Sequence, residues 1–265
     1  MKKIIGSVLI VILIVLIIVG VIVLNSKEKD DRENTLVIGL DDSFPPMGFR
    51  NENNEIVGVD IDIANAVCEK LGMKLKLQQI SWASKEQELD SGNIDCIWNG
   101  FAYTEDRAKT MTLTDAYIKT KMYFILKDGT TIKTQDELKG KKIGVQSGSV
   151  QEADLENSEF GKNVEIVPFA DFVTAFTDLE AGGIDALYTS SIIGNYLMNL
   201  QDNNYVTINA ENISTANGMV IAFKQGNTEL KDKVESALKE LENEGKLKEI
   251  SEKWFGTDMI KIEER

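Results

Sequence analysis

Hydrophobic and polar positions divide the chain into one long apolar segment followed by many short ones. Residues 4–24 carry no charge and are mostly Ile, Val and Leu. At 1.5 Å per residue, a helix of this length spans about 30 Å, the thickness of a bilayer's hydrocarbon core. Residues 26–35 are polar and charged and have little to bury. The pattern predicts a transmembrane helix in residues 1–25 and a tether in residues 26–35.

Beyond residue 35, short apolar runs alternate with amphipathic stretches. We expect strands at residues 36–40, 74–80, 94–98, 142–146, 164–168, 184–188 and 219–223. We expect helices at residues 60–71 and 85–89, from residue 150, at residues 171–180, and twice within residues 230–254. Strands that alternate with helices in this way predict a parallel α/β architecture.

Polar residues mark the expected ends of these elements. Asp60 is interpreted as the N-cap of its helix, and Gly92 and Gly182 as residues that end helices. The polar stretch at residues 50–55 predicts a hairpin-like turn. The charged side chains of the short helix that follows residue 84 predict a solvated face, formed by Lys85, Glu86 and Glu88.

One short pattern occurs twice. Residues 92–98 read G-N-I-D-C-I-W, and residues 182–188 read G-G-I-D-A-L-Y. Each follows an amphipathic helix and ends in an aromatic residue. About 230 residues follow the N-terminal segment, which is enough for two lobes of ordinary domain size. We therefore expect two lobes of one design.

The N-terminal segment differs from a typical cleaved signal. Such a signal has a shorter apolar region followed by small residues at the cleavage site. Here the first alanine is Ala64, and the first cysteine, which could carry a lipid, is Cys68. An uncleaved signal anchor is our preferred interpretation, with cleavage as the alternative. Lys2 and Lys3 place its N-terminus in the cytoplasm and the rest of the chain outside the cell membrane.

Composition excludes several kinds of chemistry. The chain has 43 Asp and Glu against 29 Lys and Arg, a net charge of −14 that disfavours a nucleic-acid partner. It has no histidine, which removes Ser-His-Asp and Cys-His catalysis and His-ligated zinc. Cys68 and Cys96 fit no metal-ligand spacing, so we expect buried free thiols, with a disulfide left open. We expect no cofactor, metal site or catalytic residue.

Candidate ligand contacts gather after predicted strands, because ligands of parallel α/β sheets bind beyond the carboxyl ends of strands. Arg107 offers a planar, two-pronged donor for a carboxylate. Ser149 and Val150 open a helix whose free N–H groups suit the same anion. Phe44 and Trp82 have rings that fit the walls around a small ligand. The remaining candidates are Asp41, Gly100, Ala102 and Ser190.

Each of these residues also has a structural interpretation. Arg107 can form an ordinary surface ion pair with Glu105 or Asp106, and such pairs stabilise a protein little. Phe44 and Trp82 can belong to a hydrophobic core. Ser149 can be a simple helix cap, and Asp41 can lie in a strand-to-loop turn.

Taken in order, the motifs resemble the solute-binding proteins of polar amino-acid ABC transporters, family 3 of that class. The motifs are LVIGLDDSFPPMGF (36–49), VGVDIDIANAV (57–67), SGNIDCIWNGFAYTEDRAKTMTLTDAYI (91–118), LKGKKIGVQSGS (138–149), GGIDALYTSS (182–191) and LENEGKLKEISEKWFG (241–256). The resemblance implies a type II periplasmic-binding-protein-like fold of two α/β lobes joined by two hinge strands. It implies hinges near residues 118–121 and 216–218. It places lobe one at residues 36–118 and 218–260 and lobe two at residues 119–217, with a tail at 261–265.

The resemblance also implies roles for the candidate residues. Arg107 matches the arginine that pairs with the ligand α-carboxylate, and Ser149 and Val150 match the carboxylate contacts from lobe two. Backbone groups of Gly100 and Ala102 match contacts with the amine and the carboxylate. Phe44 and Trp82 match the aromatic pair around the ligand, and Asp41 and Gln146 match contacts to its side chain.

Two positions depart from the family pattern. Ala102 stands where the family usually has Thr, which removes a hydroxyl contact. Ser190 stands where the family usually has an Asp for the ligand's ammonium, and a buried ammonium without a carboxylate is costly. Either Asp41 or the rings of Phe44 and Trp82 compensate, or the ligand lacks an ordinary α-amine. The resemblance therefore leaves the ligand open.

These observations predict a function. We expect a monomeric, membrane-tethered extracellular receptor that closes on a small amino acid or related carboxylate and delivers it to an ABC permease. One alternative is a sensory module that reports the ligand to a separate membrane partner. A dehydratase on the same fold is a weaker alternative, because without histidine the cleft offers only Asp41 as an obvious acid or base.

Overall fold

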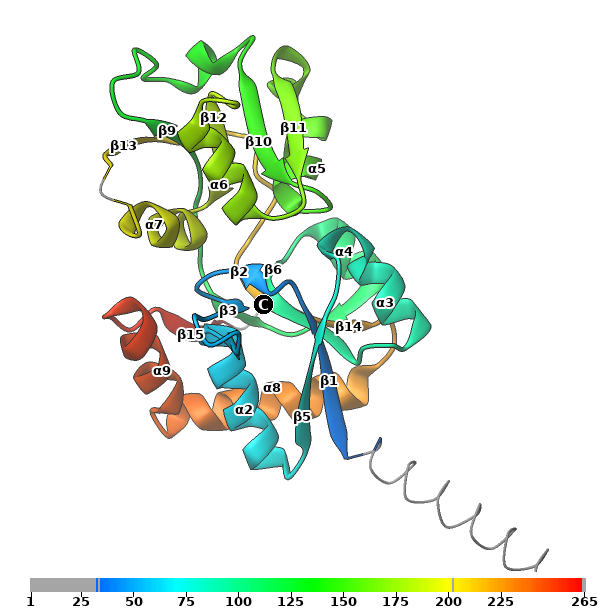
Figure 1. The fold of residues 1–265 in the computed structure, drawn as a ribbon. Coiled ribbons are helices and arrows are strands. Elements are labelled where there is room, and N and C mark those ends of the chain that lie inside the picture. Colours follow the sequence, from blue (N-terminus) through cyan, green and yellow to red (C-terminus); the bar gives the residue numbers. More distant parts are fainter. Residues whose placement is uncertain (1–31, 33, 202, 264–265) are drawn as a thin grey trace, which may run out of the picture.

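The computed structural model describes residues 32, 34–201 and 203–263, which form two lobes, each built on its own β-sheet (Figure 1). The predicted anchor at residues 1–25 and most of the predicted tether lie outside the described residues. Within the described part of the chain, no helix is both long and apolar enough to cross a bilayer.

The first lobe is built on a mixed sheet with strand order β15-β8-β14-β6-β1-β5, with β7 beside β14. Its strands are β1 (Thr35–Leu40), β5 (Lys74–Gln79), β6 (Cys96–Ala102), β7 (Met111–Leu113), β8 (Ala116–Ile118), β14 (Met219–Lys224) and β15 (Ile260–Glu263). β1 runs parallel to β5 and β6, as the alternating pattern predicts. β14 runs antiparallel to β6, which makes the sheet mixed rather than parallel throughout.

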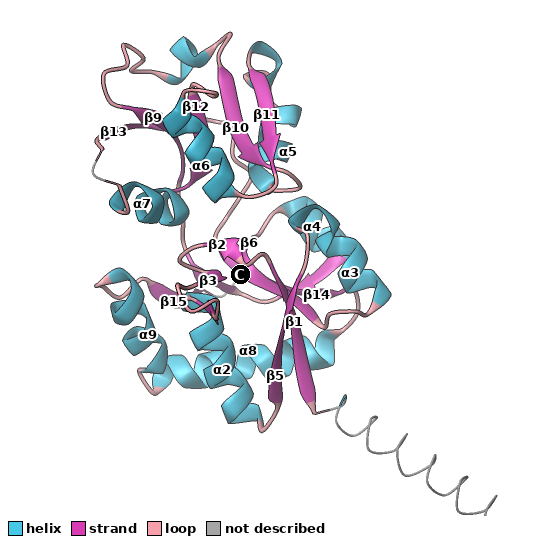
Figure 2. Cartoon of the chain, in the orientation of Figure 1, coloured by secondary structure: helices cyan, strands magenta, loops and turns pink. Residues whose placement is uncertain are grey.

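Helices cover both faces of this sheet (Figure 2). They are α2 (Val59–Leu71), α3 (Lys85–Ser91), α4 (Glu105–Thr110), α8 (Thr228–Asn243) and α9 (Lys246–Phe255), with a short 3-10 turn η1 (Trp82–Ser84). A three-stranded sheet of β2 (Ser43–Phe44), β3 (Gly48–Arg50) and β4 (Ile56–Val57) lies beside them. The turn predicted at residues 50–55 joins β3 to β4.

The second lobe is built on a sheet with strand order β11-β10-β12-β9-β13. Its strands are β9 (Met122–Lys127), β10 (Lys142–Gln146), β11 (Glu165–Phe169), β12 (Ala186–Ser190) and β13 (Tyr205–Asn209). Its helices are α5 (Val150–Asn157), α6 (Phe172–Ala181) and α7 (Ser191–Asn199), with short 3-10 turns η2 (Gln135–Leu138) and η3 (Gly161–Asn163). β10, β11 and β12 are parallel, whereas β9 runs antiparallel to β12.

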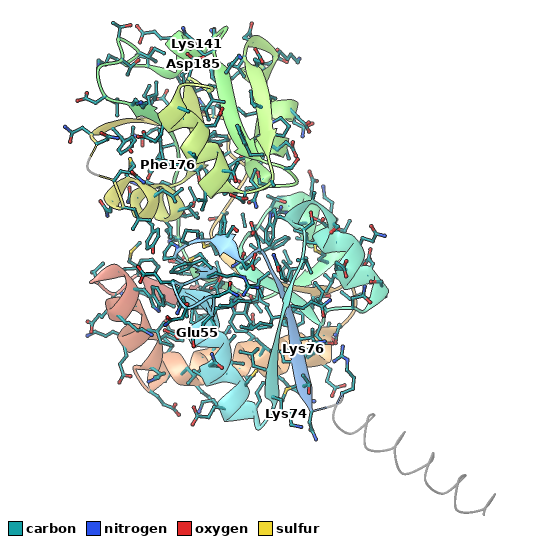
Figure 3. All side chains as sticks on the ribbon, in the orientation of Figure 1. Glu55, Lys74, Lys76, Lys141, Phe176 and Asp185 are labelled. Carbon is teal, nitrogen blue, oxygen red and sulfur yellow. The ribbon has the colours of Figure 1, made fainter. Side chains whose placement is uncertain are left out.

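The repeated pattern has one structural role in both lobes. The Asp95 N–H donates to the Val37 carbonyl (2.8 Å), and the Asp95 carboxylate accepts the Val37 N–H (2.7 Å). Asp185 makes the same two bonds to Lys142, at 2.9 and 2.8 Å. Asp185 lies at the end of the second lobe that faces away from the first (Figure 3). Each aspartate therefore fixes the start of its strand against the neighbouring parallel strand.

Three sequence-based expectations about the first lobe are wrong. The strand predicted at residues 94–98 is β6, which continues through Asn99 and Gly100 to Ala102 because β14 pairs along it. Asp60 does not cap α2: the N-cap is Gly58, and the Asp60 side chain is buried. Lys85 does not lie on a solvated face, because it is also buried.

Other expectations agree with the structure. Gly92 and Gly182 end α3 and α6 in the left-handed conformation. Cys68 and Cys96 are buried free thiols, which excludes the disulfide. One bound differs: β15 extends to Glu263, beyond the end at residue 260 expected for lobe one, because Ile260 and Glu263 pair with β8.

The chain passes between the lobes in two short segments. Ile118 pairs with Met219 in the first sheet, whereas the Lys121 carbonyl accepts the Ser191 N–H of the second lobe (2.7 Å). The Thr215 N–H donates to Asp154 of α5 (2.9 Å), whereas the Asn217 N–H donates to the Tyr103 carbonyl of the first lobe (3.0 Å). The crossings therefore fall at residues 119–120 and at residue 216.

Candidate functional site: the cleft between the lobes

A narrow cleft, partly open to solvent, lies between the two lobes. It is lined by Phe44, Trp82, Gly100, Ala102, Arg107, Thr120, Met122, Gln146, Ser149, Val150, Gln151, Phe172, Ser190 and Met219. Every residue that the sequence predicts for the site lines this cleft except Asp41. Asp41 lies directly behind the wall, where its carboxylate accepts a hydrogen bond from Gln146 Nε2 (2.5 Å).

Arg107 is the charged side chain among these lining residues. It lies in α4, whose N-cap Thr104 accepts the Arg107 N–H (3.1 Å). Its guanidinium lies 4.0 Å from the centre of the Phe101 ring, and Nη1 donates to the Ala102 carbonyl (2.7 Å). Within the described residues Arg107 makes no ion pair, and Asp106 pairs with Lys109 instead. Burial lowers the pKa of Arg107 to about 10, so the side chain stays charged at neutral pH.

Gly100 lies in β6 with φ +58, next to the rings of the cleft. A Cβ at this position would lie 2.6 Å from the Phe44 ring, so only glycine fits. The Gly100 N–H donates to the buried Asp60 carboxylate (2.6 Å), which also accepts the Tyr117 hydroxyl (2.7 Å). Burial raises the pKa of Asp60 to about 7. The Gly100 N–H is therefore already bonded, and Asp60 positions Gly100.

Three aromatic side chains form a wall of the cleft. The Phe44 and Trp82 rings are nearly parallel, with centroids 6.3 Å apart and an interplanar angle of 11°. Phe172 of the second lobe lies 5.7 Å from Phe44. Both Phe44 and Trp82 are buried, so the core and ligand-wall interpretations are not exclusive.

The second lobe contributes the ends of two parallel strands and one helix start. Gln146 ends β10, Ser190 ends β12, and Ser149 caps α5 by accepting the Glu152 N–H (3.2 Å). The first N–H groups of α5, including that of Val150, have no acceptor within the helix. Gln146 Oε1 and Ser190 Oγ are buried and have no hydrogen-bond partner in the described part of the chain. Buried polar atoms are rarely left unpaired, which points to ligand donors.

Asp41 completes this polar region. Its carboxylate also accepts the Ser43 N–H (2.9 Å), and its own N–H donates to Asn99 Oδ1 (3.1 Å). The pKa of Asp41 is raised to about 6, mainly by burial and less by Asp171 and Asp42, while the hydrogen bonds from Ser43 and Gln146 lower it. No cation pairs with Asp41 within the described ranges. A carboxylate without a cationic partner in the described ranges therefore lies behind Gln146.

The sequence missed five lining residues: Thr120, Met122, Gln151, Phe172 and Met219. Phe172 opens α6 directly after β11, so the strand-end rule that indicated Ser149 could have found it. Thr120 and Met219 flank the crossings between the lobes, and only the tertiary structure brings them to the cleft.

A family model described as bacterial extracellular solute-binding proteins, family 3, matches residues 36–257. The chain belongs to this family. The L-cystine-binding protein TcyJ of Escherichia coli (strain K12) is 31% identical to this solute-binding protein over 229 residues, which cover 86% of this chain and 85% of that protein.

Solved structures agree with this family. An ancestral arginine-binding protein bound to arginine matches with a TM-score of 0.78 and 33% identity, over 84% of this chain and 99% of that one. An ABC uptake transporter substrate-binding protein from Streptococcus pneumoniae with bound histidine matches with a TM-score of 0.79 and 31% identity, over 88% of this chain and 97% of that one.

These similarities confirm the two-lobed periplasmic-binding-protein-like fold and the family predicted from the motifs. The solute-binding protein is an amino-acid-binding component of an ABC uptake transporter and acts outside the cytoplasm. The relatives are named as binding proteins, which confirms the expectation that the chain is not an enzyme.

Proposed function

We propose that this solute-binding protein holds a polar α-amino acid in the cleft, with the ligand α-carboxylate on Arg107. The single observation that carries the proposal is the state of Arg107: it lines the cleft, is charged, and makes no ion pair within the described residues. Stacking on Phe101 and the bond to Ala102 hold the guanidinium in place and leave its other N–H groups for an anion. The Val150 N–H suits the same carboxylate, whereas the Ser149 N–H already donates to the Gln146 carbonyl (3.2 Å).

The rest of the cleft favours a ligand with hydrogen-bond donors or a positive charge. Among the residues that the structure describes, Ser190 Oγ and Gln146 Oε1 are acceptors without partners, and the Asp41 carboxylate has no cation. The ligand ammonium fits Ser190 Oγ, which replaces the missing family carboxylate with a weaker acceptor. A cationic or imidazole side chain can face the Phe44 and Trp82 rings and point toward Gln146 and Asp41. The arginine and histidine complexes of the related structures are of this kind.

Calorimetric titration of the full-length protein in detergent tests this proposal, with arginine, histidine, glutamine and cystine as ligands. We expect saturable binding of at least one, and tighter binding of arginine or histidine than of cystine. Binding confined to acidic amino acids would contradict the assignment of Asp41. Binding that survives Arg107→Ala without loss of affinity would contradict the carboxylate site.

We infer that the crossings at residues 119–120 and residue 216 act as hinges for closure of the lobes. Each crossing is flanked by residues bonded to opposite lobes, so rotation there leaves both sheets intact. This supports lobe one at residues 36–118 and 218–260 and lobe two at residues 119–217. A ligand that touches both lobes stabilises the closed arrangement.

We also propose that residues 4–24 anchor the protein in the membrane beside its ABC permease. The support is their length and lack of charge, together with Lys2 and Lys3 before them. After cell fractionation and a high-salt wash, the protein should remain in the membrane fraction with its N-terminal segment intact. A mature N-terminus beyond residue 24 would contradict the anchor.

A further inference from the structure

Lys85 is a buried lysine that bridges the two lobes beside the cleft. It is the first residue of α3 and is 1% exposed. Its Nζ donates to the Trp82 carbonyl of its own lobe (3.2 Å) and to the Gly148 carbonyl of the second lobe (2.7 Å). It also forms an ion pair with Glu86 (3.0 Å). An ammonium has three donors, and these three acceptors match them.

The second-lobe acceptor lies in the turn that leads to the ligand site. Gly148 comes directly before Ser149 and Val150, and its N–H donates to the Glu152 carboxylate (2.7 Å). Gly148 has φ +72, and a Cβ there would lie 2.8 Å from Ala83 Cα of the first lobe. The two backbones therefore meet at this point, and Lys85 and Glu152 hold Gly148 from its two sides.

Lys85 itself does not line the cleft. If Lys85 served its own lobe alone, all of its acceptors would lie in that lobe. Two of them do, at Trp82 and Glu86. The bond to Gly148 instead breaks when the lobes separate, and water then replaces the carbonyl. Burial lowers the pKa of Lys85 and Arg107 lowers it further, while Glu86 and Glu152 raise it. These groups surround the ammonium, and its bond to Gly148 requires the two lobes to lie together at this point.

We propose that Lys85 is a positioning residue that stabilises the closed cleft and so slows ligand release without contacting the ligand. This rests on the proposed function, because it requires that the ligand leaves by separation of the lobes. A hydrogen bond from a charged donor typically changes an equilibrium by about tenfold or more. Loss of Lys85 should therefore raise the ligand dissociation rate about tenfold and change the association rate much less.

The variant Lys85→Met tests this, because it keeps a long apolar chain and removes the three donors. Spin labels at Lys76→Cys and Lys141→Cys report the distance between the lobes; Figure 3 shows these positions in separate lobes. Cys68 and Cys96 are buried, so labels attach at the introduced cysteines. In the full-length protein without ligand, Lys85→Met should shift the distance distribution toward longer values.

Two further variants separate positioning from general stability. Lys109→Met removes an exposed lysine of the same lobe that pairs with Asp106, and it should leave distances and rates unchanged. Lys85→Arg keeps the charge and the donors, and it should restore part of the closed population. Thermal unfolding of each ligand-free variant is followed in parallel.

The outcomes distinguish failure of the Lys85 proposal from failure of the proposed ligand binding. Unchanged distances and dissociation rates in Lys85→Met would overturn the proposal, as would equal effects of Lys109→Met. A lower unfolding temperature without a change in the distances would also overturn it, since Lys85 would then serve its own lobe. The distance measurement needs no ligand, so it stands even if none of the tested amino acids binds.

Discussion

Arg107→Met should abolish tight ligand binding and leave the ligand-free fold almost unchanged. In most proteins a buried arginine holds a carboxylate, and its removal leaves that carboxylate unpaired at a high cost. Arg107 makes no such pair within the described ranges. The variant loses the contact with Phe101 and the bond to Ala102, and it also relieves the burial that lowers the pKa of Arg107.

The structure sets the size of both effects. A two-pronged contact of the guanidinium with a carboxylate loses two charged hydrogen bonds, each of about 1.5–3 kcal/mol. Because the Val150 N–H remains, we expect the lower end of about 3 kcal/mol, which weakens binding by about 100-fold. The lost contacts and the relieved burial nearly cancel in the ligand-free protein. We therefore expect an unfolding temperature within about 4 °C of the wild-type value.

Arg32→Met is the matched control, because Arg32 has a carboxylate partner away from the cleft. Its two Nη atoms bind Asp95 at 2.8 and 2.6 Å. This variant should keep its ligand affinity. Calorimetric titration and thermal unfolding of both variants give the comparison. Undiminished affinity in Arg107→Met, or a large loss of stability without ligand, would refute the assignment of Arg107 as the carboxylate anchor.

Three further substitutions test other parts of the site. Ser190→Asp should strengthen binding of common α-amino acids by about tenfold, because a carboxylate then meets the ligand ammonium, whereas Ser190→Asn should not. Equal affinities of the two variants would contradict an ammonium beside Ser190. Burial raises the pKa of Asp60 to about 7, from about 4 in an unfolded chain. Between these two pH values the folded protein binds more protons than the unfolded chain, so the free energy of unfolding falls as the pH rises. Asp60→Asn should remove this loss of stability, which amounts to up to about 4 kcal/mol. Denaturant titration from pH 4 to pH 8 measures it, and a variant with an unchanged pH profile would exclude the contribution of Asp60. Gly148→Ala places a methyl group 2.8 Å from Ala83 Cα, so it should weaken ligand binding and lengthen the distance between the lobes; unchanged values of both would refute the close approach.

Local pattern was sufficient to predict most of the elements. The strand expected at residues 142–146 is β10 with the same bounds, because the apolar run is short and polar residues bound it. The turn at residues 50–55 and the glycines at the ends of α3 and α6 depend on backbone conformations that few residues adopt. The strand-end rule and the family resemblance together named ten residues, and nine of them line one cleft, because parallel strands bring their carboxyl ends to one edge.

Two of the three errors share a physical cause, which is tertiary burial of a charged side chain. Asp60 and Lys85 both stand at helix starts, where a charge ordinarily faces water or caps the helix. Asp60 instead turns inward to Gly100 and Tyr117, and Lys85 turns inward to the second lobe. Nothing within ten residues of either position indicates these partners. The third error has a different cause: pairing with β14 extends β6 beyond its predicted end.

Free hydrogen-bonding capacity separates ligand contacts from positioning residues in this cleft. Arg107, Gln146 Oε1 and Ser190 Oγ retain hydrogen-bonding capacity, and all three belong to residues that line the cleft. Asp60 and Lys85 are as polar and as buried, but protein groups occupy their hydrogen bonds and neither lines the cleft. A ligand can therefore satisfy the first group, whereas the second group holds the backbone at Gly100 and Gly148 in place. Substitutions in the first group should change which ligand binds, and substitutions in the second group should change how long any ligand stays.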